Sequence, residues 1–309
     1  MKKYLSPLLL LAAAMIWGFA FVAQKAASVL PTFSLLFSRS IIATAALLVI
    51  TVLSDKLSGH GRQLFSIKEK KIGITARELI GGAVCGIFLF AASALQQAGI
   101  ADTDAGKTSF ITALYVVIVP IYALLFKKKS PINAWIGVSV AVVGFYLLCI
   151  KDGFSIAPSD LLVFGCAFIF AMHIMAIDSN LPSCDGVRLS LVQFATVTVL
   201  SLVAALIFDP PIDNAALGSV ILPILYLGIG SSGLAYTFQI LGQRGTQPAV
   251  ASIILSLESV FGALFSALVL GERMLPREYL GSALVLLAVI ISQVDIISII
   301  KGKRSANAD

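Results

Sequence analysis

Long apolar segments, separated by short polar stretches, run almost from one end of the chain to the other. Ten of them approach or exceed the roughly 20 residues that a helix needs to cross about 30 Å of hydrocarbon. An apolar segment in lipid must satisfy its own backbone groups, and the period-two alternation of membrane β-barrels is absent. We therefore predict an all-α, polytopic membrane protein. The ten expected transmembrane helices are Leu5–Ala27, Phe33–Leu53, Leu79–Ala98, Thr103–Phe126, Ile132–Ile150, Leu161–Ile177, Leu189–Phe208, Leu217–Leu241, Pro248–Leu270 and Tyr279–Ile297.

The composition fits a membrane protein, because 59% of the 309 residues are hydrophobic and only 12% are charged. The mean hydropathy is +0.99. The first apolar segment begins like a secretory signal peptide but continues to Ala27, which predicts an uncleaved helix. The cysteines have no CxxC spacing, so they indicate neither a metal site nor a disulfide framework. These four residues are Cys85, Cys149, Cys166 and Cys184.

The positions of Lys and Arg predict the orientation of the chain, because cytoplasmic loops collect basic residues. If the N-terminus lies in the cytoplasm, the inner loops and ends hold 16 Lys and Arg and the outer ones hold 5, with Arg39 inside a helix. We therefore expect a multi-pass protein of the cell membrane with both termini in the cytoplasm. The net charge of +6 then reflects inner loops that meet the lipid bilayer, and we expect no nucleic-acid partner.

The two halves of the chain share a pattern of residues at a constant separation. Gly137 also recurs as Gly281, at a separation one residue longer than that of the other pairs. Each copy would contain five helices, and this odd number would make the two copies antiparallel in the membrane. Such inverted repeats are typical of alternating-access transporters. We predict one five-helix repeat at residues 1–152, a second at 153–300, and a cytoplasmic tail at 301–309. The recurring residues are Gln96, Gly99, Thr103 and Ser109, which match Gln239, Gly242, Thr246 and Ser252.

Several motifs resemble the EamA branch of the drug/metabolite transporter superfamily, and the resemblance covers almost the whole chain. They are Trp17-Gly18-Phe19-Ala20-Phe21, Arg39, Ala105 through Pro120, Ser252 through Phe265, Leu270-Gly271-Glu272-Arg273 and Tyr279-Leu280-Gly281. The resemblance implies a ten-helix secondary transporter whose cargo is an amino acid, a sugar, a nucleotide sugar or another metabolite. The first repeat has Lys127-Lys128-Lys129 where the second has Gly271-Glu272-Arg273. The glutamate of this motif is therefore present only once, as Glu272, and only Glu272 can perform its function.

Charged side chains inside membrane spans are costly and mark candidate functional sites. Arg39 is suited to a carboxylate or phosphate, and Glu258 to an ammonium group. A carboxyl group in the membrane could also carry a proton, which would couple transport to a proton gradient. His173 is a candidate for proton coupling or for contact with a polar substrate. The structural alternative is that Arg39 and Glu258 bond each other or nearby carbonyls and only lock the packing.

Polar and aromatic side chains form stripes at helical spacing on several expected helices. Such residues can line a cavity, although they can also bond between helices or face lipid. Gln193 falls in the second repeat where Arg39 stands in the first, so the expected site is asymmetric in charge. The candidate substrate-binding residues are Trp17, Phe21, Arg39, Gln96, Thr112, Tyr115, His173, Gln193, Tyr236, Gln239 and Glu258.

Motifs for catalysis or nucleotide hydrolysis are missing. Ala105-Gly106-Lys107-Thr108 ends like a phosphate loop, but the upstream glycine is misplaced and no strand precedes it. We therefore expect no enzyme, no cofactor and no metal. The sequence predicts a secondary transporter of small polar organic solutes, and the family resemblance implies an exporter of metabolites such as amino acids. The alternatives are a non-transporting membrane scaffold or accessory protein and a transporter of sugar-nucleotide or lipid-linked cargo; the oligomeric state is left open.

Overall fold

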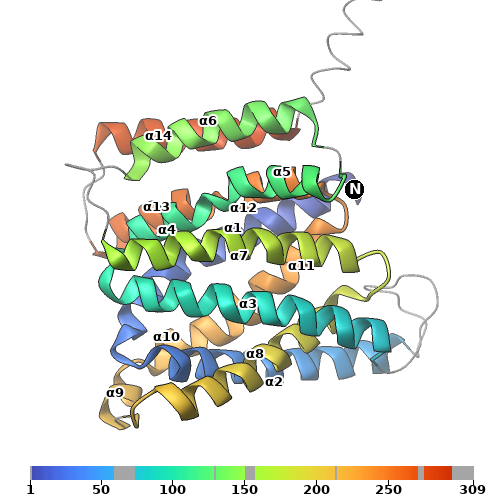
Figure 1. Ribbon diagram of the computed structural model, residues 1–309, viewed down its shortest axis with the longest axis vertical. Coiled ribbons are helices and arrows are strands. Elements are labelled where there is room, and N and C mark those ends of the chain that lie inside the picture. The colour runs from blue at the N-terminus through green and yellow to red at the C-terminus, as the bar shows by residue number, and fades with distance from the viewer. Residues whose placement is uncertain are drawn as a thin grey trace, which may run out of the picture.

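The computed structural model describes residues 2–58, 74–128, 130–149, 157–212, 214–270 and 275–293, and every regular element within these ranges is helical (Figure 1). The elements of the first half are α1 Lys2–Ala26, η1 Ala27–Val29, α2 Thr32–Ser58, α3 Ala76–Asp102, α4 Ala105–Ala113, α5 Tyr115–Leu125 and α6 Ile132–Cys149. Those of the second half are α7 Pro158–Asn180, α8 Gly186–Phe208, α9 Asn214–Ser219, α10 Ile221–Leu225, the π-helix η2 Tyr226–Ala235, α11 Tyr236–Gln243, α12 Pro248–Leu255, α13 Glu258–Leu270 and α14 Pro276–Gln293.

Eight helical segments within the described ranges are long and apolar enough to cross a membrane, and a ninth, Ile132–Leu147, is apolar but shorter. Each of the ten expected spans contains helix, and the two remaining ones are α6 and α14. The expected spans Ile132–Ile150 and Tyr279–Ile297 both run on into residues outside the described ranges. Glu272 and the tail at 301–309 lie outside them as well. The predicted all-α class is confirmed, and the described ranges contain eight candidate membrane-spanning segments.

Polar and apolar residues are distributed in the opposite way from a soluble protein. Large apolar side chains such as Leu206 and Leu268 are 78% and 79% exposed on the outer faces of their helices. Polar side chains such as His173, Gln193 and Ser232 are fully buried. A water-soluble monomer rarely exposes so much contiguous apolar surface, whereas lipid is a suitable environment for it. The chain is therefore a multi-pass membrane protein.

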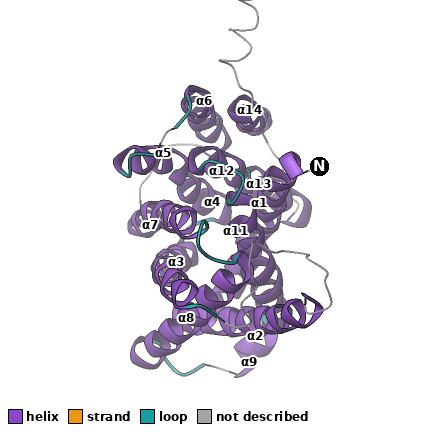
Figure 2. Ribbon diagram, turned by 90° about the vertical axis from the view of Figure 1, so that its right-hand side faces the viewer, coloured by secondary structure: helices purple, strands orange, loops and turns teal. Residues whose placement is uncertain are grey.

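The helices pack in layers around α1, as the two views show (Figures 1 and 2). The helices α6 and α14 lie together at one end of the molecule, and α2 and α8 lie at the other. Between them, α3 packs on α7, and α1 packs on α13. At Gly18 of α1 an added Cβ would come within 2.4 Å of the Cβ of Phe261, so the missing side chain is what permits this close approach.

Side-chain caps explain why two helices begin where they do. Thr75 Oγ1 accepts a hydrogen bond from the backbone N–H of Glu78, and the Glu78 carboxylate accepts one from the backbone N–H of Thr75. This capping box starts α3 at Ala76, three residues before the apolar segment begins. Asp185 caps α8 by accepting from the N–H groups of Val187 and Arg188.

Three of the expected continuous helices are interrupted in the structure. The span Thr103–Phe126 is divided into α4 and α5 at Leu114, and Pro248–Leu270 into α12 and α13 at Ser256 and Leu257. At both breaks the backbone makes tight bonds between residues three apart, including Leu114 N–H to Ile111 O and Leu257 N–H to Ile254 O. The span Leu217–Leu241 contains the π-helix η2, where the turn widens instead.

Candidate functional site

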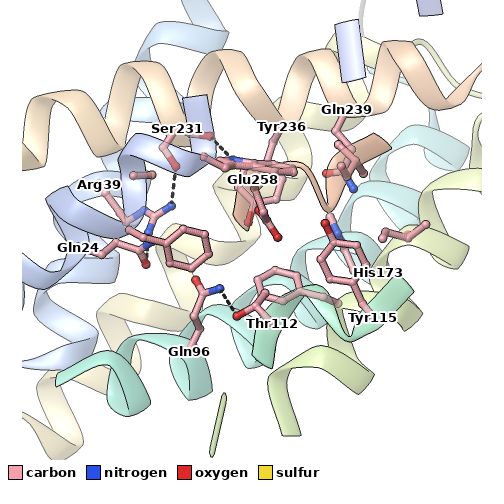
Figure 3. A pocket seen from close by; sticks show the side chains of 16 residues that line it. Gln24, Arg39, Gln96, Thr112, Tyr115, His173, Ser231, Tyr236, Gln239 and Glu258 are labelled. Carbon is pink, nitrogen blue, oxygen red and sulfur yellow. Dashed lines mark hydrogen bonds between the residues drawn. The ribbon is translucent and has the colours of Figure 1, made fainter. Parts of the chain in front are cut away.

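A cavity containing about 460 Å³ of space not filled by atoms lies among the helices that these interruptions modify. Side chains from both halves of the chain face it (Figure 3). The lining residues are Trp17, Ala20, Phe21, Gln24, Arg39, Gln96, Thr112, Tyr115, Phe170, His173, Ile174, Ser231, Tyr236, Gln239, Leu255 and Glu258.

Both broken helices contribute the residues that flank their breaks. Thr112 lies near the end of α4 and Tyr115 opens α5, while Leu255 ends α12 and Glu258 opens α13. Tyr115 and Glu258 stand at the same separation along the chain as Gln96 and Gln239, which also line the cavity. Discontinuous helices expose polar backbone ends inside the membrane and are typical of substrate sites in transporters.

Arg39 is buried, with 6% of its surface exposed, and all of its hydrogen bonds go to neutral side chains. Its Nε donates to Ser232 Oγ at 3.0 Å. The two Nη atoms make longer contacts of 3.4 Å, one to Gln24 Oε1 and one to Ser231 Oγ. A buried guanidinium is normally paired with an anion, so this arrangement leaves a strong donor fork available inside the cavity.

Glu258 is the second charged side chain of the cavity, and it is 4% exposed. No ion pair joins it to Arg39, although both residues belong to the described part of the chain. Its Oε1 atom has no hydrogen-bond partner. Glu258 opens α13, where the positive end of the helix dipole favours a carboxylate. The mutual ion pair considered as a structural alternative is therefore absent.

Tyr236 occupies the middle of an aromatic wall. The ring of Trp17 lies 4.6 Å from that of Tyr236, and His173 and Phe194 approach the same ring at 5.9 and 5.4 Å. The indole N–H of Trp17 donates to the backbone carbonyl of Ser231 at 3.2 Å, within the π-helix. The aromatic rings therefore place apolar surface beside Arg39 and Glu258, and such surface can contact the carbon skeleton of an organic solute.

The structure brings ten of the eleven predicted site residues together around one cavity. The exception is Gln193 of α8, which lies behind the cavity wall and contacts His173 Nε2 through its Oε1 at 2.8 Å. Gln96 points across the cavity floor and donates to Thr112 Oγ1 at 3.1 Å (Figure 3). No group of three or more His, Cys, Asp and Glu side chains in the described ranges is placed to hold a metal ion.

Gln24 and Ser231 are the polar lining residues that the predicted set omitted. Gln24 shares a helical stripe with Trp17 and Phe21, so spacing alone could have included it. Ser231 could have been recognised from its setting, because Gly228, Gly230 and Gly233 surround it and such small residues permit unusual helix geometry. The apolar omissions are Ala20, Phe170, Ile174 and Leu255.

Polar contacts also tie the helices together at both ends of the bundle. At one end Lys25 Nζ donates to the carbonyls of Ile100, Ala101 and Thr103, and Lys107 Nζ pairs with Asp160 Oδ2 at 2.6 Å. At the other end Arg244 donates to Cys184 O at 2.7 Å, and partial burial lowers the pKa of its guanidinium from the usual value. The two groups of contacts lie at opposite ends of α7, and His173 of the same helix lines the cavity.

Helices from both halves of the chain surround one cavity lined by polar and aromatic side chains, an arrangement typical of membrane transporters. A family model for the EamA-like transporter family matches residues 5–150 and again residues 157–293. The chain therefore belongs to the EamA-like transporter family, and the predicted resemblance is confirmed. Members of this family are transporters and not enzymes.

Two individual proteins are similar to this chain. One from Archaeoglobus fulgidus, named "Uncharacterized transporter", is 35% identical over 211 residues, which are 68% of this chain and 67% of that protein. A solved structure described as "Crystal structure of protein" superimposes with a TM-score of 0.72 at 17% sequence identity, over 93% of this chain and 96% of the other. At 17% sequence identity, the similarity to this solved structure shows a shared fold alone.

Proposed function

We propose that this membrane transporter is a secondary exporter of small polar organic metabolites, in particular zwitterions such as amino acids. The observation that carries the proposal is that Arg39 and Glu258 are both buried in one cavity and are not paired with each other. Burying two unpaired charges of opposite sign is costly unless a ligand compensates them. A zwitterion carries the two complementary charges on one small molecule.

The two ends of the cavity suit the two ends of a zwitterion. Arg39 has long, weak contacts at both Nη atoms, which a carboxylate could replace with a bidentate pair. Glu258 Oε1 lacks a partner and would accept from an ammonium group. The rings of Trp17 and Tyr236 would contact the organic body of the solute. Figure 3 shows Arg39 on one side of Tyr236 and His173 with Gln239 on the other.

Alternating access would operate between two inverted repeats of five helices each, residues 1–152 and 153–300. In support, the family model matches the chain twice, and Tyr115 and Glu258, which follow the two helix breaks, have the same separation along the chain as Gln96 and Gln239. Transporters of this design rock one repeat against the other around a central site. The polar contacts of Lys25 and of Arg244, near opposite ends of α7, would then break alternately.

Proton coupling is part of the proposal and is assigned to Glu258. Intramembrane carboxylates commonly exchange a proton against a substrate, because an empty site cannot easily hold the bare charge. In the proposed cycle, the substrate ammonium and a proton would compete for the Glu258 carboxylate. The direction of transport, export, is proposed from the family resemblance.

The test uses purified protein in proteoliposomes loaded with each of the twenty standard amino acids in turn. Counterflow of the labelled amino acid should occur without ATP, and an imposed pH gradient should drive net accumulation. Glu258→Gln should lose the response to the pH gradient while retaining some exchange. If no amino acid moves but sugar nucleotides or lipid-linked cargo do, the zwitterion assignment is wrong and the second cargo class takes its place.

A further inference from the structure

Three buried hydrogen-bond acceptors of the cavity wall have no partner. They are Glu258 Oε1, Gln239 Oε1 and His173 Nδ1, on side chains that are 4%, 2% and 0% exposed. All three side chains line the same cavity, although they come from α13, α11 and α7. A buried polar atom without a hydrogen bond loses its hydration and gains nothing in return. Three such atoms around one space indicate a ligand that donates hydrogen bonds.

The contact with Gln193 assigns His173 Nδ1 as an acceptor. His173 Nε2 lies 2.8 Å from Gln193 Oε1, and an amide oxygen can only accept. With the Gln193 amide in this orientation the Nε2 atom carries the hydrogen, and in a neutral imidazole the Nδ1 atom then has a free lone pair. Gln193 acts here as a positioning residue, because it orients the ring without lining the cavity.

Tyr115 completes this end of the cavity. Its hydroxyl group lies within reach of a hydrogen bond to the Glu258 carboxylate, although the geometry of this contact is not that of a regular hydrogen bond. A tyrosine hydroxyl can accept one hydrogen bond and donate another. It can therefore donate to Glu258 when the cavity is empty and accept from a ligand when the cavity is filled.

We propose that Glu258, Gln239 and His173 form a subsite that selects a primary ammonium group. A primary ammonium has three N–H donors, one for each of the three unpartnered acceptors, and its charge complements Glu258. Each N-methyl group added to the ligand removes one donor and leaves one buried acceptor unsatisfied. The inference rests on the proposed function, since it assigns the ammonium end of the transported zwitterion.

The expected selectivity follows from the strength of hydrogen bonds to charged groups. Losing one hydrogen bond to a charged group weakens binding by about tenfold or more. Affinity should therefore fall about tenfold or more with each N-methyl group. The same ranking should hold for ligands without a carboxylate, because the Arg39 end of the cavity is not involved.

The test is calorimetric titration of the purified full-length protein in detergent with two series of ligands. The first series is the best-bound standard amino acid with its N-methyl, N,N-dimethyl and N,N,N-trimethyl derivatives. The second is n-butylamine with N,N,N-trimethylbutylammonium. We expect the order primary, secondary, tertiary and quaternary in the first series, and preference for the primary amine in the second.

Variants identify the atoms responsible. Gln239→Leu should reduce the preference for primary over quaternary ammonium about tenfold, whereas Gln239→Glu should keep it, because a carboxylate still accepts. Gln193→Leu should weaken the preference too, since it frees the His173 ring. The matched control is Gln97→Leu, because Gln97 is 1% exposed and also has an unpartnered Oε1 but does not line the cavity. This variant should keep the wild-type preference.

The outcomes separate this inference from the proposed function. If amino acids bind but their N-methylated derivatives bind equally well, the ammonium subsite is refuted while zwitterion transport stands. If primary amines bind in preference to quaternary ones but amino acids do not bind, the subsite stands and the zwitterion assignment fails. Binding of neither series overturns both.

Discussion

Some charged residues of the bundle are paired with an opposite charge, and Arg39 is not. Lys107 with Asp160, and Lys128 with Asp178, form ion pairs between helices near the ends of the bundle. Arg39 contacts neutral side chains only. Removing one member of an ion pair leaves the other without compensation, whereas removing Arg39 leaves no stranded charge. Substitutions in the ion pairs and at Arg39 should therefore have opposite effects on folding and binding.

Arg39→Gln and Glu258→Gln should purify as folded protein with melting temperatures in detergent close to that of the wild type. Both should lose at least about tenfold in amino-acid affinity, because a charge-assisted hydrogen bond to the ligand is removed. Asp160→Asn should instead lower the melting temperature, since Lys107 loses its carboxylate partner, and leave affinity nearly unchanged. Thermal melting with and without the amino acid measures both effects. Collapse of Arg39→Gln during purification would identify Arg39 as structural.

Residue types in the expected spans predicted most of the cavity, because a polar or charged group in lipid needs a reason to be there. Arg39, His173 and Glu258 were identifiable on this ground, and all three line the cavity. Gln193 is also a polar residue within an expected span, but it does not line the cavity and instead contacts His173. Sequence spacing does not distinguish a side chain that faces the cavity from one that supports it.

At the scale of helices, positions were predictable but interruptions were not. Apolar length located every long helix of the described ranges, but not the helix breaks. The break at Leu114 has no glycine or proline at its centre, and Pro120 lies further along α5. The break at Ser256 is accompanied by a bond from its own hydroxyl to Ile253 O, which competes with the helical backbone. Such competition depends on tertiary context, so hydrophobic patterning does not reveal it.

The contact between α1 and α13 should be sensitive to the smallest enlargement. Gly18→Ala would place a Cβ 2.4 Å from the Cβ of Phe261 and 2.8 Å from the backbone nitrogen of Gly262, so the helices must move apart. We expect a loss of about 1–3 kcal/mol, seen as a lower melting temperature. Gly106→Ala is the matched control, because nothing lies within 4 Å of the added Cβ. Equal melting temperatures for the two variants would contradict the close packing.

The π-helix η2 supports the cavity through Ser231 and Ser232, which contact Arg39. A π turn contains an extra residue, so deletion of Ile229, which is 48% exposed, should convert the segment to α-helix and keep the fold. The two serines would rotate relative to Arg39, and ligand-induced stabilisation should fall. Deletion of Leu202 in the regular helix α8 is the control, and it should lower the melting temperature by shifting the register. A wild-type ligand response in the Ile229 deletion would show that the π geometry has no role in binding.

At the scale of the whole molecule, the sequence predicted an all-α membrane protein of the correct family. The duplicated pattern from Gln96 to Ser252 also agrees with two matches to the family model, at residues 5–150 and 157–293. The count of ten membrane spans depends on α6 and α14, which pack together at one end of the bundle. Both expected spans run on beyond the described ranges, so their described parts, α6 and α14, are shorter than the predicted spans.

Orientation of the chain is the last prediction, and it tests the inverted arrangement of the repeats. Single cysteines replace Lys127 or Ile212 in a background with all four native cysteines changed to alanine. If the chain follows the basic-residue rule, an impermeant maleimide should label Lys127→Cys only from the cytoplasmic side and Ile212→Cys only from outside. Both positions are exposed, so access depends on the side of the membrane.

Restoring only Cys184 to this background provides the control for non-specific reaction. Cys184 is 3% exposed, and burial raises the pKa of its thiol, so it should stay unlabelled from either side. Labelling of Lys127→Cys and Ile212→Cys from the same side would contradict the antiparallel relation between the two repeats. Arg39 and Glu258 would still line one cavity, but this cavity would have to open by a motion other than the rocking of two inverted halves.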